Sequence, residues 1–168
     1  PSMVKSYFSC DVLVVGAGPA GLMAAGQAAG SGKKTILLEK MEQPGVKLLL
    51  TGKGRCNLTN TASISESLEH FNPGGKFLTQ VFYQFHTQQL QDFFQSLGLP
   101  TVEQRGGRVY PASEKSRDVL QVLLSWCERV GVELVKGTRI EELLIENHQI
   151  TGALTSRGKY ISPIVILA

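Results

Sequence analysis

The first forty residues show an apolar strand pattern, a helix pattern and a second apolar strand pattern in succession. Residues 11–15 and 34–39 are short runs with apolar centres, as expected of strands buried on both faces. Between them, residues 19–31 are rich in alanine and predict a helix. Two strands joined by such a helix are parallel, with a right-handed crossover. The pattern therefore predicts a βαβ unit whose first turn lies at the carboxyl edge of a sheet, where ligands bind.

The middle of the chain predicts a loop followed by helices. Residues 41–60 are rich in glycine and lysine and predict an irregular loop. From residue 63 to residue 97 the apolar side chains recur at helical spacing, which predicts two or three short helices with a break at Asn72–Gly75.

The last part of the chain predicts a hairpin, a helix and more strands. Residues 101–110 alternate as in a small hairpin outside the main sheet, with Gly106 and Gly107 as its turn. Residues 115–130 predict a helix. The remaining strands are a third parallel strand at 132–135 and a three-stranded meander at 140–146, 150–156 and 160–168.

The turn after the first strand carries a glycine motif. Residues 16–21 read GAGPAG, which fits G-x-G-x-x-G between a predicted strand and a predicted helix. In that context the glycines allow a tight turn, the close approach of a pyrophosphate and close packing of the helix on the strand. The N–H groups and the positive end of the helix would hold the diphosphate. The predicted contacts are Gly16, Gly18, Pro19, Ala20 and Gly21.

An acidic residue follows at the end of the second strand. Glu39 lies 18 residues after Gly21, where its carboxylate can accept hydrogen bonds from ribose hydroxyls. The same carboxylate would repel a 2′-phosphate, although Lys40 weakens this objection. The turn therefore predicts FAD or NAD rather than NADP.

Charge and cysteine content exclude several classes of protein. Seventeen Lys and Arg against fourteen Asp and Glu leave a net charge of +3, which does not indicate nucleic acid or an anionic membrane as a partner. Glycines and a proline interrupt the apolar run 12–30, so it is interpreted neither as a signal peptide nor as a membrane span. Cys10, Cys56 and Cys127 are widely spaced, which predicts no disulfide framework and no metal site, and favours a reducing, cytoplasmic compartment.

The loop at residues 45–60 reads GVKLLLTGKGRCNLTN and combines cations with glycines and uncharged polar residues. Its cations, Lys47, Lys53 and Arg55, suit a polar ligand that bears phosphate. The alternative is a solvated basic loop whose asparagines and threonines satisfy turns. Cys56 is either a thiolate favoured by this basic surrounding or a packed thiol.

The run GRCNLTN at 54–60, together with GRVYP at 107–111, resembles the signature of the BaiN-like or HI0933-like flavoprotein family, also known as aminoacetone oxidase-like. With the βαβ start and the meander, the resemblance covers essentially the whole chain. It implies a three-layer FAD/NAD(P)-binding, Rossmann-like α/β domain with a central parallel sheet, helices on one face and a β-meander on the other. The implied activity is that of an FAD-dependent oxidoreductase acting on a small-molecule substrate, with NAD(P)H or a reduced substrate as hydride donor.

The resemblance also implies where the cofactor lies. Arg55, Cys56 and Asn57 would be nearest the flavin, and the backbone of Arg139 or Ile140 would lie beside the adenine. The other expected cofactor contacts are Lys40, Lys47, Gly54 and Ala168. Residues 1–168 would form the N-terminal part of the FAD-binding domain, ending before a Thr-Gly-Gly turn and an inserted domain, so weak FAD binding and no turnover are expected.

Other functions stay open at this point. An NAD-binding dehydrogenase or a SAM-binding enzyme would use the same βαβ start. A tRNA-modifying flavoprotein shares this type of domain, but the sequence has no basic patch interleaved with aromatic residues. A third class is a cofactor-free interaction domain. The sequence assigns no catalytic residue and no oligomeric state.

Overall fold

The computed structural model describes residues 6–71 and 73–168, and the chain divides into two compact units. The first unit contains residues 1–48 and 123–168, and the second contains residues 49–122. The first unit is thus built from both ends of the chain.

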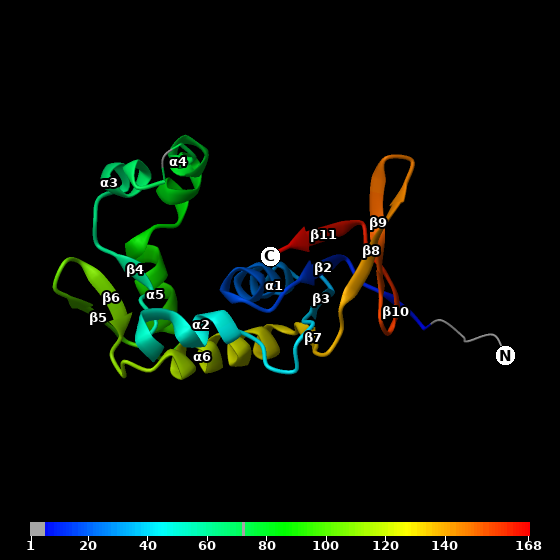
Figure 1. Ribbon diagram of the computed structural model, residues 1–168, viewed down its shortest axis with the longest axis horizontal. Helices are drawn as coiled ribbons and strands as arrows, with labels where there is room; N and C mark the ends of the chain where they lie inside the picture. The colour runs from blue at the N-terminus through cyan, green and yellow to red at the C-terminus, as the bar shows by residue number, and fades with distance from the viewer. Residues whose placement is uncertain (1–5, 72) are drawn as a thin grey trace. The chain divides into compact units, whose positions relative to one another are not determined.

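A four-stranded parallel sheet forms the centre of the first unit (Figure 1). Helix α1 (Pro19–Gly30) connects its two inner strands and packs on them. The strand order is β11-β2-β3-β7, with β2 at Val12–Val15, β3 at Thr35–Leu38, β7 at Glu133–Val135 and β11 at Ile164–Leu167. All three pairings are parallel. The predicted βαβ unit and the predicted third parallel strand are confirmed.

An antiparallel meander forms the second sheet of this unit. It consists of β8 (Ile140–Glu146), β9 (Gln149–Thr155) and β10 (Gly158–Ile161), and β1 (Tyr7–Ser9) pairs in parallel with β10. The meander is confirmed, but the single strand predicted at 160–168 is wrong. The chain breaks at Ser162 and Pro163, where the Ser162 hydroxyl donates to the Ile164 carbonyl and proline has no N–H for a ladder. Strand β11 then crosses to the parallel sheet.

The parallel sheet is buried on both faces because successive residues point to opposite sides. Leu13, Ile36 and Leu38 form one core with Ala153 and Tyr160 of the meander. The neighbours of opposite parity are also buried and face the helices: Val12, Val14 and Leu37. The first unit therefore has the predicted three layers, with helices on one face of the sheet and the meander on the other.

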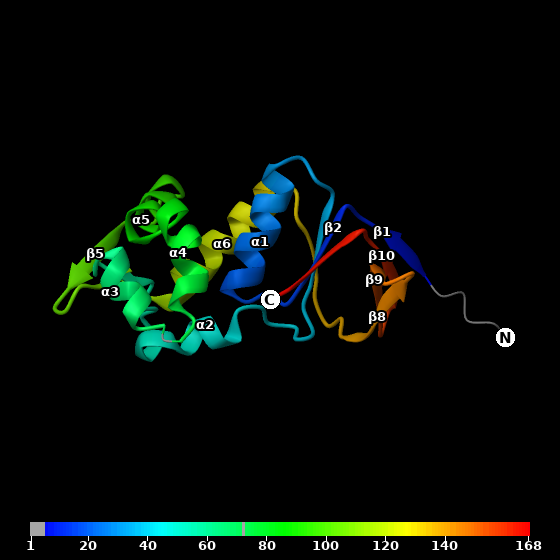
Figure 2. The same cartoon turned by 90° about the horizontal axis from the view of Figure 1, so that it is seen from above.

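Helix α6 (Ser116–Val130) confirms the helix predicted at 115–130, and its last turns lie beside α1 (Figure 2). The Cys127 thiol donates to the Leu22 carbonyl of α1 at 3.2 Å. A Cβ placed on Gly26 would lie 2.2 Å from the Trp126 ring. Burial raises the pKa of Cys127 to about 11, so this thiol stays protonated at neutral pH.

The second unit contains three short helices and a small sheet. The helices are α3 (Ile64–Glu69), α4 (Gly75–Gln84) and α5 (Thr87–Ser96). The sheet has the order β4-β6-β5, with β4 at Thr59–Asn60, β5 at Thr101–Gln104 and β6 at Arg108–Pro111. The predicted helices and the predicted hairpin outside the main sheet are confirmed. Of the predicted break, Asn72 lies outside the described residues and Gly75 begins α4.

The irregular loop predicted at 41–60 is wrong in part. Helix α2 spans Val46–Leu50, the 3-10 turn η1 spans Thr51–Gly54, and β4 follows. The apolar run of residues 48–50 supports a helical turn that the surrounding glycines and lysines concealed. Strand β4 is only two residues long, and its backbone pairing with β6 has no sequence pattern that would reveal it.

Three further findings concern membranes, metal ions and cysteines. Among residues 6–71 and 73–168, no helix is long and apolar enough to cross a membrane, and no three metal-ligating side chains form a cluster. The three cysteines are buried and free.

The contact between α1 and α6 gives a test of the fold. We expect Gly26→Ala to destabilise the protein by about 1–3 kcal/mol, because the added methyl group must displace the Trp126 ring from a packed interface. Urea unfolding followed by the fluorescence of Trp126, the single tryptophan, measures the change. The matched control is Gly30→Ala at the end of the same helix, where a Cβ would meet nothing within 4 Å. It should stabilise by about 0.4–1 kcal/mol; equal effects of the two variants would contradict the packing argument.

Candidate functional site

The glycine turn between β2 and α1 contains glycines of two kinds. A Cβ on Gly21 would lie 1.7 Å from the Gly16 carbonyl oxygen, and a Cβ on Gly16 would lie 2.4 Å from the carbonyl oxygen of Ala168. Gly16 also has a φ of +98°, which disfavours other residues. Backbone packing therefore requires glycine at positions 16 and 21. A Cβ on Gly18 would meet nothing within 4 Å, so only Gly18 borders open space.

A cavity of about 820 Å³ opens at this turn, at the carboxyl ends of β2, β3 and β11. All the residues that line it belong to the first unit. Ten of the residues predicted from the sequence are among them: Gly16, Gly18, Pro19, Ala20, Glu39, Lys40, Lys47, Arg139, Ile140 and Ala168. Gly21 is buried beneath the turn. The structure therefore gathers the predicted nucleotide contacts of the first unit around one cavity.

Helix α1 begins at this cavity without a side-chain cap. Its N-cap residue is Gly18, Pro19 occupies the first helical position, and the first turn has no acidic residue. The N–H groups of the first turn therefore have no carboxylate or hydroxyl of the helix to bind them. Lys40, Lys47 and Arg139 add positive charge to the cavity lining. Such a helix end favours an anion, most simply a phosphate or diphosphate group.

Glu39 is buried at the end of β3, and two backbone N–H groups hold its carboxylate. Oε2 accepts from the N–H of Ala17 and Oε1 accepts from the N–H of Met41, both at 2.8 Å. The Ala17 bond ties the carboxylate to the glycine turn itself. Each carboxylate oxygen still has a second lone pair, so Glu39 can also accept hydrogen bonds from ribose hydroxyls in the cavity.

The sequence reasoning missed several residues that shape the cavity. The Gly45 N–H donates to the Ala17 carbonyl at 2.9 Å, and the Thr138 N–H donates to the Glu39 carbonyl at 2.8 Å. Both residues line the cavity, as does Met41. The pair Pro44-Gly45 is a turn signal that could have indicated the first of these contacts. The positions of Thr138 and Met41 depend on which loops meet at the edge of the sheet, and no local sequence pattern shows that.

Four predicted contacts lie in the second unit: Gly54, Arg55, Cys56 and Asn57. Cys56 is buried, and burial raises the pKa of its thiol, which fits the packed thiol rather than the thiolate. With its amide nitrogen toward the β6 side, Asn57 donates to the carbonyls of Thr59 and Val109 at 3.0 and 3.2 Å. These two side chains serve the fold of their own unit, and the contact of all four residues with a flavin stays a prediction.

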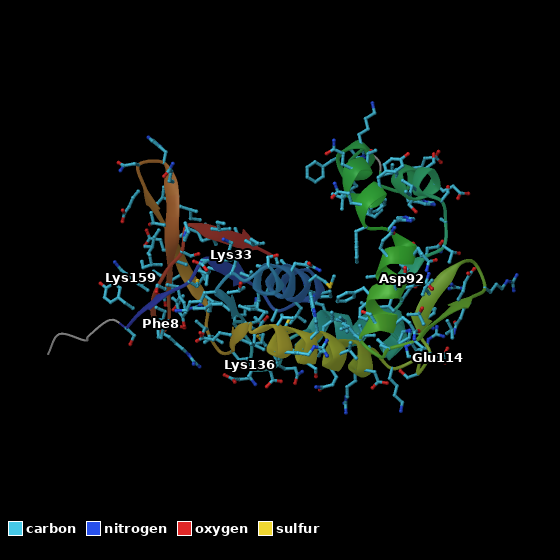
Figure 3. All side chains as sticks on the ribbon, turned by 180° about the vertical axis from the view of Figure 1, so that it is seen from behind. Phe8, Lys33, Asp92, Glu114, Lys136 and Lys159 are labelled. Atoms are coloured by element: carbon cyan, nitrogen blue, oxygen red, sulfur yellow. The ribbon has the colours of Figure 1, made fainter. Side chains whose placement is uncertain are left out.

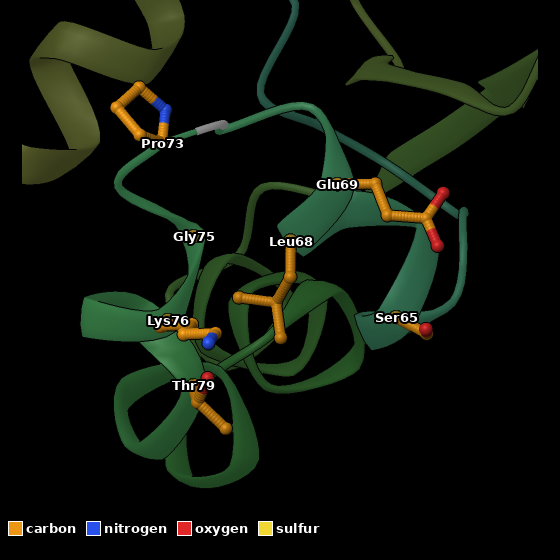
Figure 4. Close-up of a pocket in the computed structure, with 7 residues that line it drawn as sticks. All are labelled: Ser65, Leu68, Glu69, Pro73, Gly75, Lys76 and Thr79. Atoms are coloured by element: carbon orange, nitrogen blue, oxygen red, sulfur yellow. The ribbon is translucent and has the colours of Figure 1, made fainter.

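A second cavity, of about 400 Å³, lies in the second unit between α3 and α4 (Figure 4). Leu68 and Pro73 contribute its apolar lining, and Glu69 and Lys76 contribute charges of opposite sign. None of the residues predicted from the sequence lines this cavity. The first cavity is therefore the candidate functional site.

Comparison with known proteins gives the same assignment of the fold. The family model of the HI0933-like protein Rossmann domain matches residues 10–168. The 3-dehydro-bile acid delta(4,6)-reductase of Clostridium scindens is 39% identical over 132 residues, which are 77% of this chain and 32% of the relative. The ribosomal RNA dihydrouridine synthase of Escherichia coli is 26% identical over 122 residues, 73% of this chain and 30% of the relative. The chain thus spans about a third of the length of these relatives.

Among solved structures, the 3-ketosteroid-delta4-(5alpha)-dehydrogenase of Rhodococcus jostii matches with a TM-score of 0.73 at 16% identity, over 98% of this chain and 47% of that chain. THI4 of Thermovibrio ammonificans matches with a TM-score of 0.65 at 15% identity, over 95% of this chain and 57% of that chain. At these identities the matches show the fold alone. The fold of this chain is therefore shared with longer proteins.

The bonds of Glu39 give a test that needs no ligand. We expect Glu39→Gln to lower the free energy of unfolding by about 1–3 kcal/mol, because one of the two N–H groups would then face an amide NH₂ rather than an oxygen. Urea unfolding of the two proteins measures the difference. The control is Glu146→Gln, which makes the same change on an exposed residue of β8 and should leave stability within about 0.5 kcal/mol of the original. Equal losses in both variants would show that the carboxylate does not hold the turn.

Proposed function

The chain belongs to the HI0933-like protein family, and on that premise we propose that it forms the FAD-binding segment of a flavin-dependent oxidoreductase. The observation that carries the proposal is the open space at Gly18, which lies between an uncapped helix N-terminus and a buried carboxylate. Those three features match the diphosphate and the adenosine ribose of a dinucleotide. When bound, FAD supplies two-electron redox chemistry at its isoalloxazine ring.

The residues of the first unit fit the adenosine diphosphate half of FAD. The N–H groups at the start of α1 would hold the diphosphate, and Lys40 and Lys47 would add positive charge. Glu39 would bind the ribose hydroxyls, since its carboxylate is already oriented by Ala17 and Met41. The adenine edge would be read by the backbone of Arg139 or Ile140, both of which line the cavity.

The substrate that we propose is a small molecule, with NAD(P)H as the hydride donor. The support is that the relative with the higher identity is named for a bile acid, whereas the relative named for ribosomal RNA is less similar. The net charge of +3 also gives no strong electrostatic term for RNA binding. For the whole protein we propose a cytoplasmic location, which is supported by three free cysteines.

Gly18 provides the direct test of the diphosphate site. We expect Gly18→Val to weaken the binding of ADP and FAD at least about tenfold, because its side chain would fill the space where the phosphates approach the helix. Isothermal titration of the 168-residue protein measures this. Circular dichroism should show a folded variant, since a Cβ at this position meets no protein atom within 4 Å. A folded Gly18→Val protein that binds FAD as tightly as the original would exclude this turn as the diphosphate site.

The role of Glu39 is tested by the ligand rather than by stability. The original protein should prefer ADP to 2′,3′-dideoxy-ADP by about tenfold or more, because only ADP offers hydroxyls to the carboxylate. Glu39→Ala should abolish this preference, whatever it does to the overall affinity. The ratio of the two affinities is compared because a less stable glycine turn would weaken the binding of both ligands alike. A preference that persists in Glu39→Ala would mean that another group binds the ribose.

A further inference from the structure

Four groups from different segments of the second unit contact the guanidinium of Arg55. Nε donates to the Gly52 carbonyl at 3.3 Å, and Nη1 donates to the side-chain oxygen of Gln104 on β5 at 3.3 Å. Nη1 also lies 3.5 Å from Oε1 of Glu114, on the loop before α6. The guanidinium carbon lies 4.5 Å from the centre of the Tyr110 ring on β6. Together these contacts favour one orientation of the guanidinium, so less rotamer freedom is left to lose on binding a ligand.

One edge of this guanidinium is open. An arginine has five N–H donors, and the bonds above use those of Nε and Nη1. Both N–H groups of Nη2 have no protein partner among residues 6–71 and 73–168, and the side chain is 38% exposed. The two N–H groups of one nitrogen point in different directions, so a pair of negatively charged oxygens needs one N–H of Nη2 and one N–H of a neighbouring nitrogen, such as the Nη1 N–H that contacts Glu114.

Glu114 is a weak counter-ion for Arg55. Its Oε1 lies 3.5 Å from Nη1, well beyond the 2.7–2.9 Å of a strong charge-assisted bond, and its side chain is 47% exposed. Figure 3 labels Glu114 on its loop, where it has a φ of +53°. Glu114 also accepts from the side-chain amide of Gln104. An exposed pair of this geometry contributes little stability, so an incoming anion can compete with Glu114 at low cost.

We propose that Arg55 forms an anion site in the second unit for the carboxylate or phosphate group of a small ligand. Tyr110 and Gln104 orient the guanidinium, and Glu114 is the resident anion that the ligand displaces. Every residue of this site belongs to residues 49–122, and none of them lines the cavity of the proposed diphosphate site. The anion could come from a substrate or from the cofactor, and both sources share the same pair of oxygens.

The test uses the 168-residue protein without FAD. Sodium phosphate and sodium benzoate are titrated at constant ionic strength, and the side-chain Nε–H signal of Arg55 is followed by NMR. The signal is assigned by its loss in Arg55→Lys. We expect saturable shifts with the original protein and at least about tenfold weaker binding with Arg55→Lys, which keeps the charge but loses the planar fork. For Arg55→Lys, binding is followed by calorimetry.

Two further variants distinguish binding at a specific anion site from the general attraction of anions to positive charge. Glu114→Gln should tighten binding about two- to fivefold, because the competing carboxylate is removed. Arg117→Lys, a change at an exposed cation of α6, should leave binding unchanged. Weaker binding in Glu114→Gln, equal binding in Arg55→Lys, or a response that does not saturate would overturn the proposal. Glu114→Gln keeps the test decisive should Arg55→Lys fail to fold.

Adding FAD distinguishes the two sources of the anion. If saturating FAD raises the apparent dissociation constant for benzoate, the natural anion belongs to the cofactor. If benzoate binds equally well in the presence of FAD, the natural anion belongs to a separate ligand. Should the protein bind no FAD at all, the proposed function fails while the phosphate and benzoate titrations still decide the anion site.

Discussion

The close approach of three backbone segments at the glycine turn is the constraint on which the rest of the first unit depends. Helix α1 starts so near the end of β2 that a single methyl group on Gly21 would overlap the Gly16 carbonyl. A methyl group on Gly16 would in turn overlap the carbonyl of Ala168, which follows β11. This packing directs the helix N-terminus toward the carboxyl ends of the parallel strands. The cavity lies at this closely packed backbone and reaches Gly18, where a Cβ would meet no protein atom within 4 Å.

Glu39 links this turn to the rest of the cavity. Its carboxylate binds the Ala17 N–H inside the turn, while its backbone carbonyl accepts from Thr138 and its N–H donates to Val135. The glycine turn, the end of β3 and the loop after β7 are therefore joined through one residue. A buried carboxylate held in this way is oriented before any ligand arrives, so little ordering cost is left for binding.

In the second unit, side chains rather than backbone N–H groups orient the charged group of interest, the Arg55 guanidinium. The Arg55 guanidinium contacts an aromatic face, an amide and a carboxylate, and the neighbouring residues Lys53 and Cys56 have left-handed backbone. Lys53 is exposed and Cys56 is packed as a thiol, so the loop does not act as one uniform basic patch. The match to the HI0933-like family model extends over residues 10–168 and includes this loop, whose individual residues have separate physical roles.

The sequence by itself determined the βαβ unit, the third parallel strand, the meander and the glycine turn with Glu39. The βαβ unit, the hairpins of the meander and the glycine turn with Glu39 depend on periodicity and on steric rules within about thirty residues. The third parallel strand was identified by its local apolar pattern, although it pairs with β3 from far along the chain. Only the tertiary structure decided that residues 164–167 leave the meander for the parallel sheet and that Ala17 and Met41 hold Glu39. It also decided that Gln104, Tyr110 and Glu114 meet at Arg55. Most of these contacts join residues far apart in the chain, and even the Met41 bond to Glu39, two residues away, depends on how the loop after β3 turns. Hydrogen-bond partners of that kind leave no periodic signal in the sequence.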